Sequence, residues 1–153
     1  MRADRTLHRK GAGEPAPFVL WQADRMGSRF TELIVDGHDL RRLADFWCEV
    51  LGYRILEEKD SWIEIGDHEL MPEEARAGPV TPTLVFVPVP ETKSVKNRVH
   101  IDVSPIDRTQ AEEVERLERL GAKRVDIGQG EQSWVVMADP EGNEFCVLRS
   151  LQP

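Results

Sequence analysis

Residues 97–103 read Asn-Arg-Val-His-Ile-Asp-Val, and the rest of the chain is organised around this stretch. Apolar and polar residues alternate in it with a period of two, which is typical of a β-strand with one buried face. One predicted face is aliphatic: Val99, Ile101 and Val103. The other carries a cation, an imidazole and a carboxylate in a row: Arg98, His100 and Asp102. Such a row suits the wall of a polar cavity, although the exposed face of an edge strand would read the same way.

Length and composition narrow the class of protein. A chain of 153 residues with 40% hydrophobic residues is sufficient for one domain with a real core. Its net charge of -8 argues against nucleic acid or an anionic membrane as a partner. No apolar run approaches the roughly 18 residues that a membrane span needs. The composition therefore predicts a soluble protein with no nucleic-acid and no membrane partner.

The two cysteines and residues 1–27 bear on the cellular location of the protein. Cys48 and Cys146 form neither a CxxC metal pattern nor a disulfide framework, which favours a cytoplasmic location, although a single bridge between them stays open. Residues 1–27 are rich in Arg, Gly and Pro and lack the apolar segment of a secretory signal. We expect a disordered tail over residues 1–27 and a single domain over residues 28–153.

The first half of this domain changes from a strand pattern to a helical pattern. Residues 30–36 alternate like a strand, with Glu32 on the face opposite Leu33 and Val35. Asp39 then suits a helix N-cap and Gly52 a left-handed C-cap, with apolar residues at helical spacing between them. A polar loop is expected at 66–82. Three further strand patterns complete this half: 53–58, 61–65 and 83–89.

The second half repeats the same order. The strand at 98–104 leads into a helix pattern with Asp107 as N-cap, Gln110 at the capping-box position and Gly121 at the end. Both helix patterns end in Leu-Gly. Three strand patterns again follow: 123–127, 133–138 and 144–149. The order strand, helix, strand, strand, strand therefore occurs twice, which indicates an internal duplication.

Two such modules, at about 29–90 and 96–151, predict an α+β fold. In each βαβββ module the helix covers one face of the sheet, so that side by side the open faces form a curved mixed sheet around a cavity, with the helices outside. Glu32 and His100 lie opposite the apolar faces of the two first strands. Because equivalent positions of a repeat lie near its pseudo-twofold axis, we expect these two side chains to be neighbours in the cavity.

Three stretches carry a resemblance to a known family. They are Phe46-Trp-Cys-Glu-Val-Leu-Gly52, Asn97-Arg-Val-His100 and Ala138-Asp-Pro-Glu-Gly-Asn-Glu-Phe145. They resemble, in this order, the FY-x-x-x-LG end of the first helix, the opening of the second module and the DPxGN turn of the vicinal oxygen chelate superfamily. This superfamily comprises the glyoxalase, bleomycin-resistance and dioxygenase proteins. The resemblance covers about residues 29–151 and implies the fold described above.

The same resemblance bears on metal binding. Metal-dependent members of the superfamily hold a divalent ion with one residue from each first strand and one from each fourth strand, usually His and Glu. The corresponding positions here are Glu32, the strand at 83–89, His100 and Cys146, and the strand at 83–89 offers no usual ligand. The resemblance therefore implies a degenerate site without a metal cofactor. A zinc site with the three remaining ligands is the alternative.

Two functions remain open. The resemblance implies a small-molecule-binding protein of the bleomycin-resistance type, and allows a homodimer. The alternative is a lyase- or isomerase-like enzyme in which His100 and Glu32 transfer protons, with or without a divalent metal. These two residues are therefore the catalytic candidates. The ligand-binding candidates are Arg98, Asp102, Trp62, Trp134 and Cys146.

Overall fold

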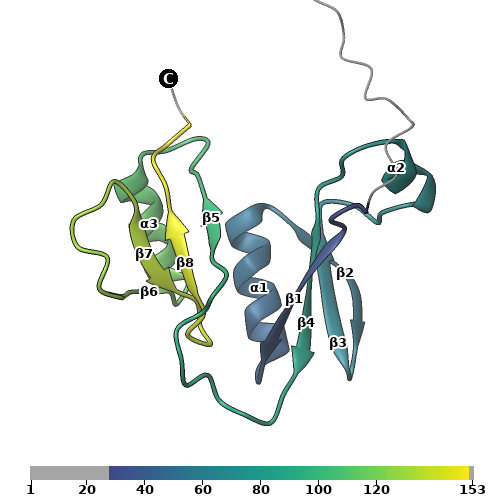
Figure 1. Ribbon diagram of the computed structural model, residues 1–153, viewed down its shortest axis with the longest axis horizontal. Helices are drawn as coiled ribbons and strands as arrows, with labels where there is room; N and C mark the ends of the chain where they lie inside the picture. Colours follow the sequence, from purple (N-terminus) through teal and green to yellow (C-terminus); the bar gives the residue numbers. More distant parts are fainter. Residues whose placement is uncertain (1–27, 152–153) are drawn as a thin grey trace, which may run out of the picture.

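A computed structural model of the protein describes residues 28–151, and its elements follow a duplicated order (Figure 1). The predicted tail at 1–27 lies outside the described residues. Module one contains β1 (Glu32–Gly37), α1 (Leu40–Leu51), β2 (Arg54–Lys59), β3 (Trp62–Gly66), α2 (Pro72–Ala77) and β4 (Thr83–Pro88). Module two contains β5 (Ile101–Val103), α3 (Gln110–Arg119), β6 (Lys123–Arg124), β7 (Val135–Ala138) and β8 (Glu144–Val147).

Each module folds into a four-stranded mixed sheet with the same strand order. The sheets are β1-β4-β3-β2 and β5-β8-β7-β6, and in each the first strand runs parallel to the fourth. The predicted α+β fold with two βαβββ modules is therefore confirmed. β1 and β5 are both edge strands, and within residues 28–151 no strand pairing joins the two sheets.

Helix α1 begins and ends where its capping residues predict. The Asp39 side chain accepts a hydrogen bond from the backbone N–H of Arg42, and Gly52 adopts the left-handed conformation with φ 68°. Four residues of its apolar stripe are buried: Leu43, Ala44, Phe46 and Trp47. This stripe packs against β3 and β4 of its own sheet.

Helix α3 begins at a different cap from the predicted one. Thr109 is the N-cap, because Glu112 N donates to its Oγ1 at 3.3 Å while Thr109 N donates to Glu112 Oε2 at 2.8 Å. Asp107 is instead bonded to the guanidinium of Arg108 at 2.8 and 2.9 Å. The expected box from Asp107 to Gln110 does not form, since the carboxylate is already engaged.

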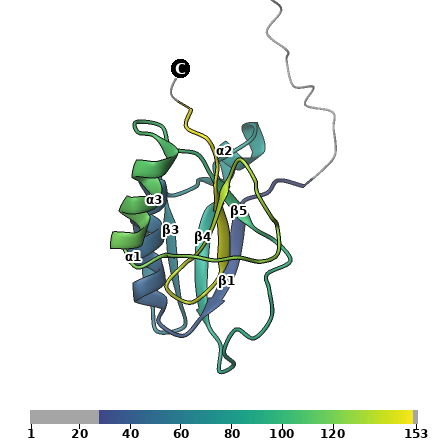
Figure 2. The same ribbon diagram turned by 90° about the vertical axis from the view of Figure 1, so that its left-hand side faces the viewer.

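The two modules share one apolar core. Figure 2 shows α1 and α3 on the same side of the molecule. From α1, the rings of Phe46 and Trp47 reach Phe145 of β8, with centroids 5.9 and 5.3 Å apart in edge-on geometry. Val114 and Leu117 of α3 belong to the same buried cluster. The modules are therefore held together by apolar packing as well as by the linker.

Further local predictions are wrong, and the expected strand at 123–127 is shortened to β6. The expected loop at 66–82 contains α2, whose start is favoured by Pro72 in the first turn and by acidic residues after it. The expected strand at 98–104 is reduced to β5. In the parallel register of β5 and β8, His100 falls opposite Glu144, the first residue of β8, so residues before His100 have no strand to pair with. Val99 is accordingly 69% exposed and does not pack under a helix.

The helices of the described part of the chain, residues 28–151, are all too short or too polar to cross a bilayer.

Candidate functional site

A cleft of about 320 Å³ opens between the edge strands β1 and β5. The indole of Trp47 lines it and donates from Nε1 to Asp139 Oδ2 at 3.2 Å. Ile34 and Val99 are 55% and 69% exposed. The apolar lining comes from both modules: Leu33, Ile34, Val35, Val99 and Ile101. The cleft therefore presents apolar surface that a small molecule would remove from water.

A second hollow, of about 340 Å³, lies around His100 on module two. The register of β5 and β8 places Asp102 opposite Cys146, so that both side chains share one face of the sheet. Six residues line the hollow: Arg98, His100, Asp102, Trp134, Cys146 and Leu148. The structure thus brings together five of the seven residues that the sequence singled out, and adds Leu148.

The other two candidates lie elsewhere. Glu32 is exposed on β1, opposite Thr83 of β4, and lines neither the cleft nor the hollow. Trp62 of β3 carries Lys59 Nζ over its ring, 4.6 Å from the centroid, and also lines neither. Within residues 28–151 Glu32 and His100 share no hydrogen bond or ion pair. A proton-transfer pair of these two residues stays a prediction.

The imidazole of His100 is bonded to the linker that precedes β5. Its Nε2 lies 2.9 Å from Lys96 Nζ and 3.2 Å from Asn97 O. An ammonium group only donates, so the contact with Lys96 requires the tautomer in which Nε2 accepts and Nδ1 carries the ring proton. In that tautomer the approach of Nε2 to Asn97 O is not a hydrogen bond, because both atoms are acceptors. In this arrangement His100 offers a ligand an N–H donor, since its lone pair is already engaged.

The thiol of Cys146 is buried beside a carboxylate. Burial raises the pKa of Cys146 most, and its hydrogen bond to Asp102 and the charge of Asp102 raise it further, to about 11. The thiolate, and not the thiol, is the nucleophile and the metal ligand. At neutral pH Cys146 is therefore a protonated hydrogen-bond donor.

The donor set does not fit the metal site that the superfamily resemblance implies. On the face that carries Glu32, β4 supplies Thr83, Val85 and Val87, none of which is an imidazole, a carboxylate or a thiol. Across residues 28–151, no three His, Cys, Asp or Glu side chains are arranged so that they could hold a metal ion. The three-ligand zinc alternative of Glu32, His100 and Cys146 is therefore not assembled either.

The linker between β4 and β5 is anchored by Glu144, a residue that is not among the candidates predicted from the sequence. Lys93 Nζ and Asn97 N donate to its two carboxylate oxygens, each at 2.9 Å. Burial acts to raise the pKa of Glu144, but the bonds from Lys93 and Asn97 outweigh it and lower the pKa below its ordinary value. Glu144 lies two residues before Cys146 and hence on the same face of β8. This spacing is the signal by which the sequence could have identified Glu144.

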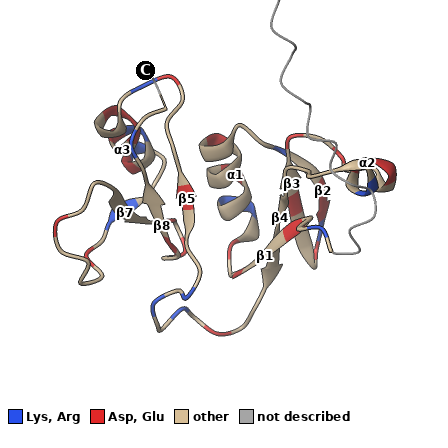
Figure 3. Ribbon diagram, turned by 45° about the horizontal axis from the view of Figure 1, so that its top comes forward, with Lys and Arg blue, Asp and Glu red and all other residues tan. Residues whose placement is uncertain are grey.

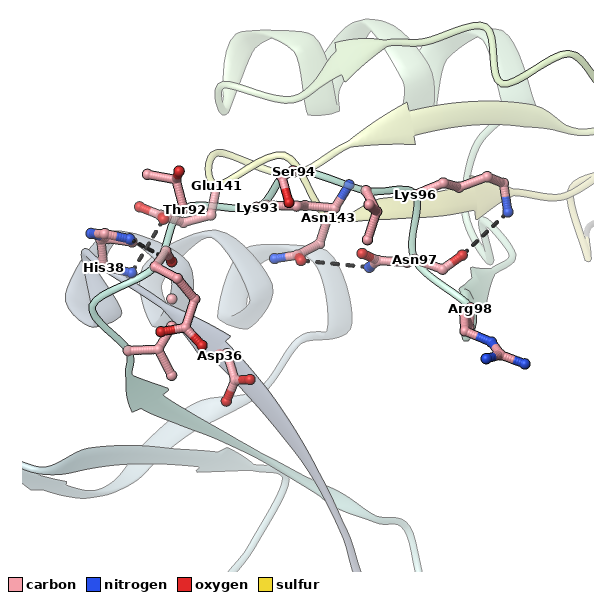
Figure 4. Close-up of a pocket in the computed structure, with 14 residues that line it drawn as sticks. Asp36, His38, Thr92, Lys93, Ser94, Lys96, Asn97, Arg98, Glu141 and Asn143 are labelled. Carbon is pink, nitrogen blue, oxygen red and sulfur yellow. Dashed lines mark hydrogen bonds between the residues drawn. The ribbon is translucent and has the colours of Figure 1, made fainter.

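A third hollow, of about 390 Å³, lies beneath the linker (Figure 4). Glu141 of the DPEGN turn lines it and joins the modules, since its carboxylate accepts from His38 N and Asp39 N at 3.2 and 3.3 Å. His38 Nε2 in turn lies 2.9 Å from Glu91 O. These polar groups are largely committed to one another, which suits a structural role for this hollow.

Arg98 lines the cleft and both hollows. Figure 4 shows its side chain pointing away from the other linker residues. Within residues 28–151 its guanidinium makes no hydrogen bond or ion pair. The linker between β4 and β5 carries blue patches in Figure 3. Among its cations, Arg98 has no partner within residues 28–151 and is free to meet a ligand.

Comparison with protein families matches residues 32–148 to the glyoxalase-like domain. The chain therefore belongs to the glyoxalase-like domain family. A search among curated proteins found no match.

Solved structures share this fold at low sequence identity. The fosfomycin resistance protein FosX from Mesorhizobium loti is 16% identical, with 82% of this chain and 96% of that chain covered and a TM-score of 0.57. Leishmania major glyoxalase I is 16% identical, with 80% of this chain and 87% of that chain covered and a TM-score of 0.54. A glyoxalase/bleomycin resistance protein/dioxygenase family enzyme from Burkholderia phytofirmans PsJN is 15% identical, with 78% of this chain and 97% of that chain covered and a TM-score of 0.54. At these identities the likeness shows the fold alone.

Proposed function

We propose that this protein binds a small organic molecule in the cleft between β1 and β5, without the help of a metal. The observation that carries the proposal is the exposed apolar surface of Ile34 and Val99 on facing walls of a cleft of about 320 Å³. Small-molecule sites have volumes of about 300–1,000 Å³ and mainly apolar walls with a few polar groups. A ligand that covers both side chains would gain the free energy of their burial.

The surroundings of His100 favour binding over the enzymatic alternative. A general base needs a lone pair within reach of the proton that it removes. The Nε2 lone pair of His100 faces Lys96 Nζ at 2.9 Å, and Glu32 lies outside the hollow around His100.

A fragment screen followed by NMR tests this proposal. The screen follows the indole N–H resonances of the full-length chain. Binding in the cleft should shift the resonance of Trp47, which lines it, and leave that of Trp62 unchanged, because Trp62 lies on β3 outside it. We expect the same hits, with the same affinities, when Zn²⁺ or Mn²⁺ is added.

A matched pair of variants locates the site. Ile34→Asp places a charge in the cleft wall and should weaken binding of every hit about tenfold or more, since it removes apolar contact and adds a desolvation cost. Ile106→Asp makes the same change at a residue that is 77% exposed and lines neither the cleft nor the hollows, so binding should be unchanged. The proposal fails if no compound shifts Trp47, or if both variants bind like the wild type.

A further inference from the structure

We propose that the ligand of this cleft carries one anionic group, a carboxylate or a phosphonate, and that Arg98 binds it. This inference rests on the proposed function and specifies the chemical class of the ligand. The chain has a net charge of -8, yet the rim of its cleft holds a cation that has no partner among the described residues, 28–151.

Two of the three carboxylates that line the cleft, Asp139 and Glu144, are already compensated. Asp139 accepts hydrogen bonds from Trp47 Nε1, from Glu141 N and from the backbone and side chain of Asn143. Glu144 accepts from Lys93 and Asn97, as described above. Neither carboxylate is therefore available to neutralise Arg98.

The three cations of the linker differ in whether their charge is compensated by a carboxylate. Lys93 is paired with Glu144 at 2.9 Å. Lys96 bonds two neutral acceptors, His100 Nε2 and Asn97 O, and so keeps its charge. Arg98 has no partner among residues 28–151. Arg98 is thus the cation of the cleft lining, and its charge is not compensated by a partner among residues 28–151.

The geometry at Arg98 suits an anion with an apolar body. A guanidinium presents a planar fork of donors that matches a carboxylate or phosphonate with two parallel hydrogen bonds. From the rim, the rest of the ligand can cover Ile34 and Val99 in the cleft. Asp36 on the facing wall is exposed and also lacks a partner in the described residues, so it disfavours a second anionic group.

Three probes with the same ring test this inference. Naphthalene-2-carboxylate, naphthalene-2-phosphonate and the neutral naphthalene-2-carboxamide are titrated into the full-length chain, and Kd is taken from the Trp47 indole resonance. At least one anion should bind about tenfold or more tighter than the amide, because a charge-assisted hydrogen bond is stronger than a neutral one. The tighter of the two anions identifies the class of ligand.

Variants at two arginines complete the test. Arg98→Gln should raise the Kd of the preferred anion about tenfold and leave that of the amide unchanged, while Arg98→Lys should fall between. Arg54→Gln is the matched control, since Arg54 is an exposed arginine of β2 that lines neither the cleft nor the hollows. It should change none of the three affinities.

The outcomes separate the two proposals. Equal binding of amide and anions, unchanged by Arg98→Gln, overturns the anionic ligand while leaving the cleft as a binding site. If none of the probes shifts Trp47 but neutral fragments of the screen do, the anionic ligand is again overturned alone. If neither probes nor fragments shift Trp47, both proposals fall together.

Discussion

Cys146 stands where metal-dependent members of the superfamily carry a ligand, but its surroundings give it another role. Burial and Asp102 raise its pKa to about 11, so that it donates a hydrogen bond at neutral pH. Asp102→Asn removes the negative charge and should lower the pKa of Cys146, increasing the thiolate fraction at pH 8.5 and hence the rate of alkylation. The pH dependence of iodoacetamide labelling, in a Cys48→Ala background, measures this shift.

Asp107→Asn is the control for this prediction. Asp107 is an exposed carboxylate bonded to Arg108 and does not line the hollow around Cys146, so labelling should be unchanged. An Asp102→Asn protein with the wild-type labelling profile would contradict the assigned hydrogen bond.

At the scale of elements, the DPEGN turn joins β7 and β8 to the first module. Asp139 is buried and accepts from Trp47 Nε1 of α1 at 3.2 Å and from Glu141 N and Asn143 N at 2.9 Å. Asp139→Ala leaves these donors without a partner and should lower the free energy of unfolding by about 3 kcal/mol, as measured by urea denaturation.

The control for the turn is Asp126→Ala. Asp126 Oδ1 accepts from Gly128 N at 2.8 Å within an exposed loop, so its loss should cost about 1 kcal/mol or less. If Asp139→Ala costs no more than this, the turn does not join the modules as described.

At the scale of the whole molecule, the shared core should make the modules unfold together. Phe145 of β8 packs against Phe46 and Trp47 of α1. Phe145→Ala should lower the free energy of unfolding by about 3–5 kcal/mol. Hydrogen exchange read by mass spectrometry should show lost protection in both β3 and β7. Ile106→Ala, at an exposed residue, should leave both protected. Lost protection in β7 alone would mean that the modules unfold separately.

Much of the fold was readable from local pattern. The caps of α1, the repeated element order and the alternation in β1 all depend on residues close in sequence. The prediction for α3 was off by two residues because Arg108 competes for Asp107, a contact that the capping pattern does not include.

The sequence by itself determined two βαβββ modules, and its alternation predicted that Arg98, His100 and Asp102 share one face. Only the tertiary structure decided that Lys96 occupies the His100 lone pair, that Glu32 lies outside that hollow, and that a cleft opens between β1 and β5. Periodicity fixes the direction of a side chain relative to its own strand. The relative position of two modules depends instead on contacts between distant residues, such as Glu141 with His38, which no local pattern encodes.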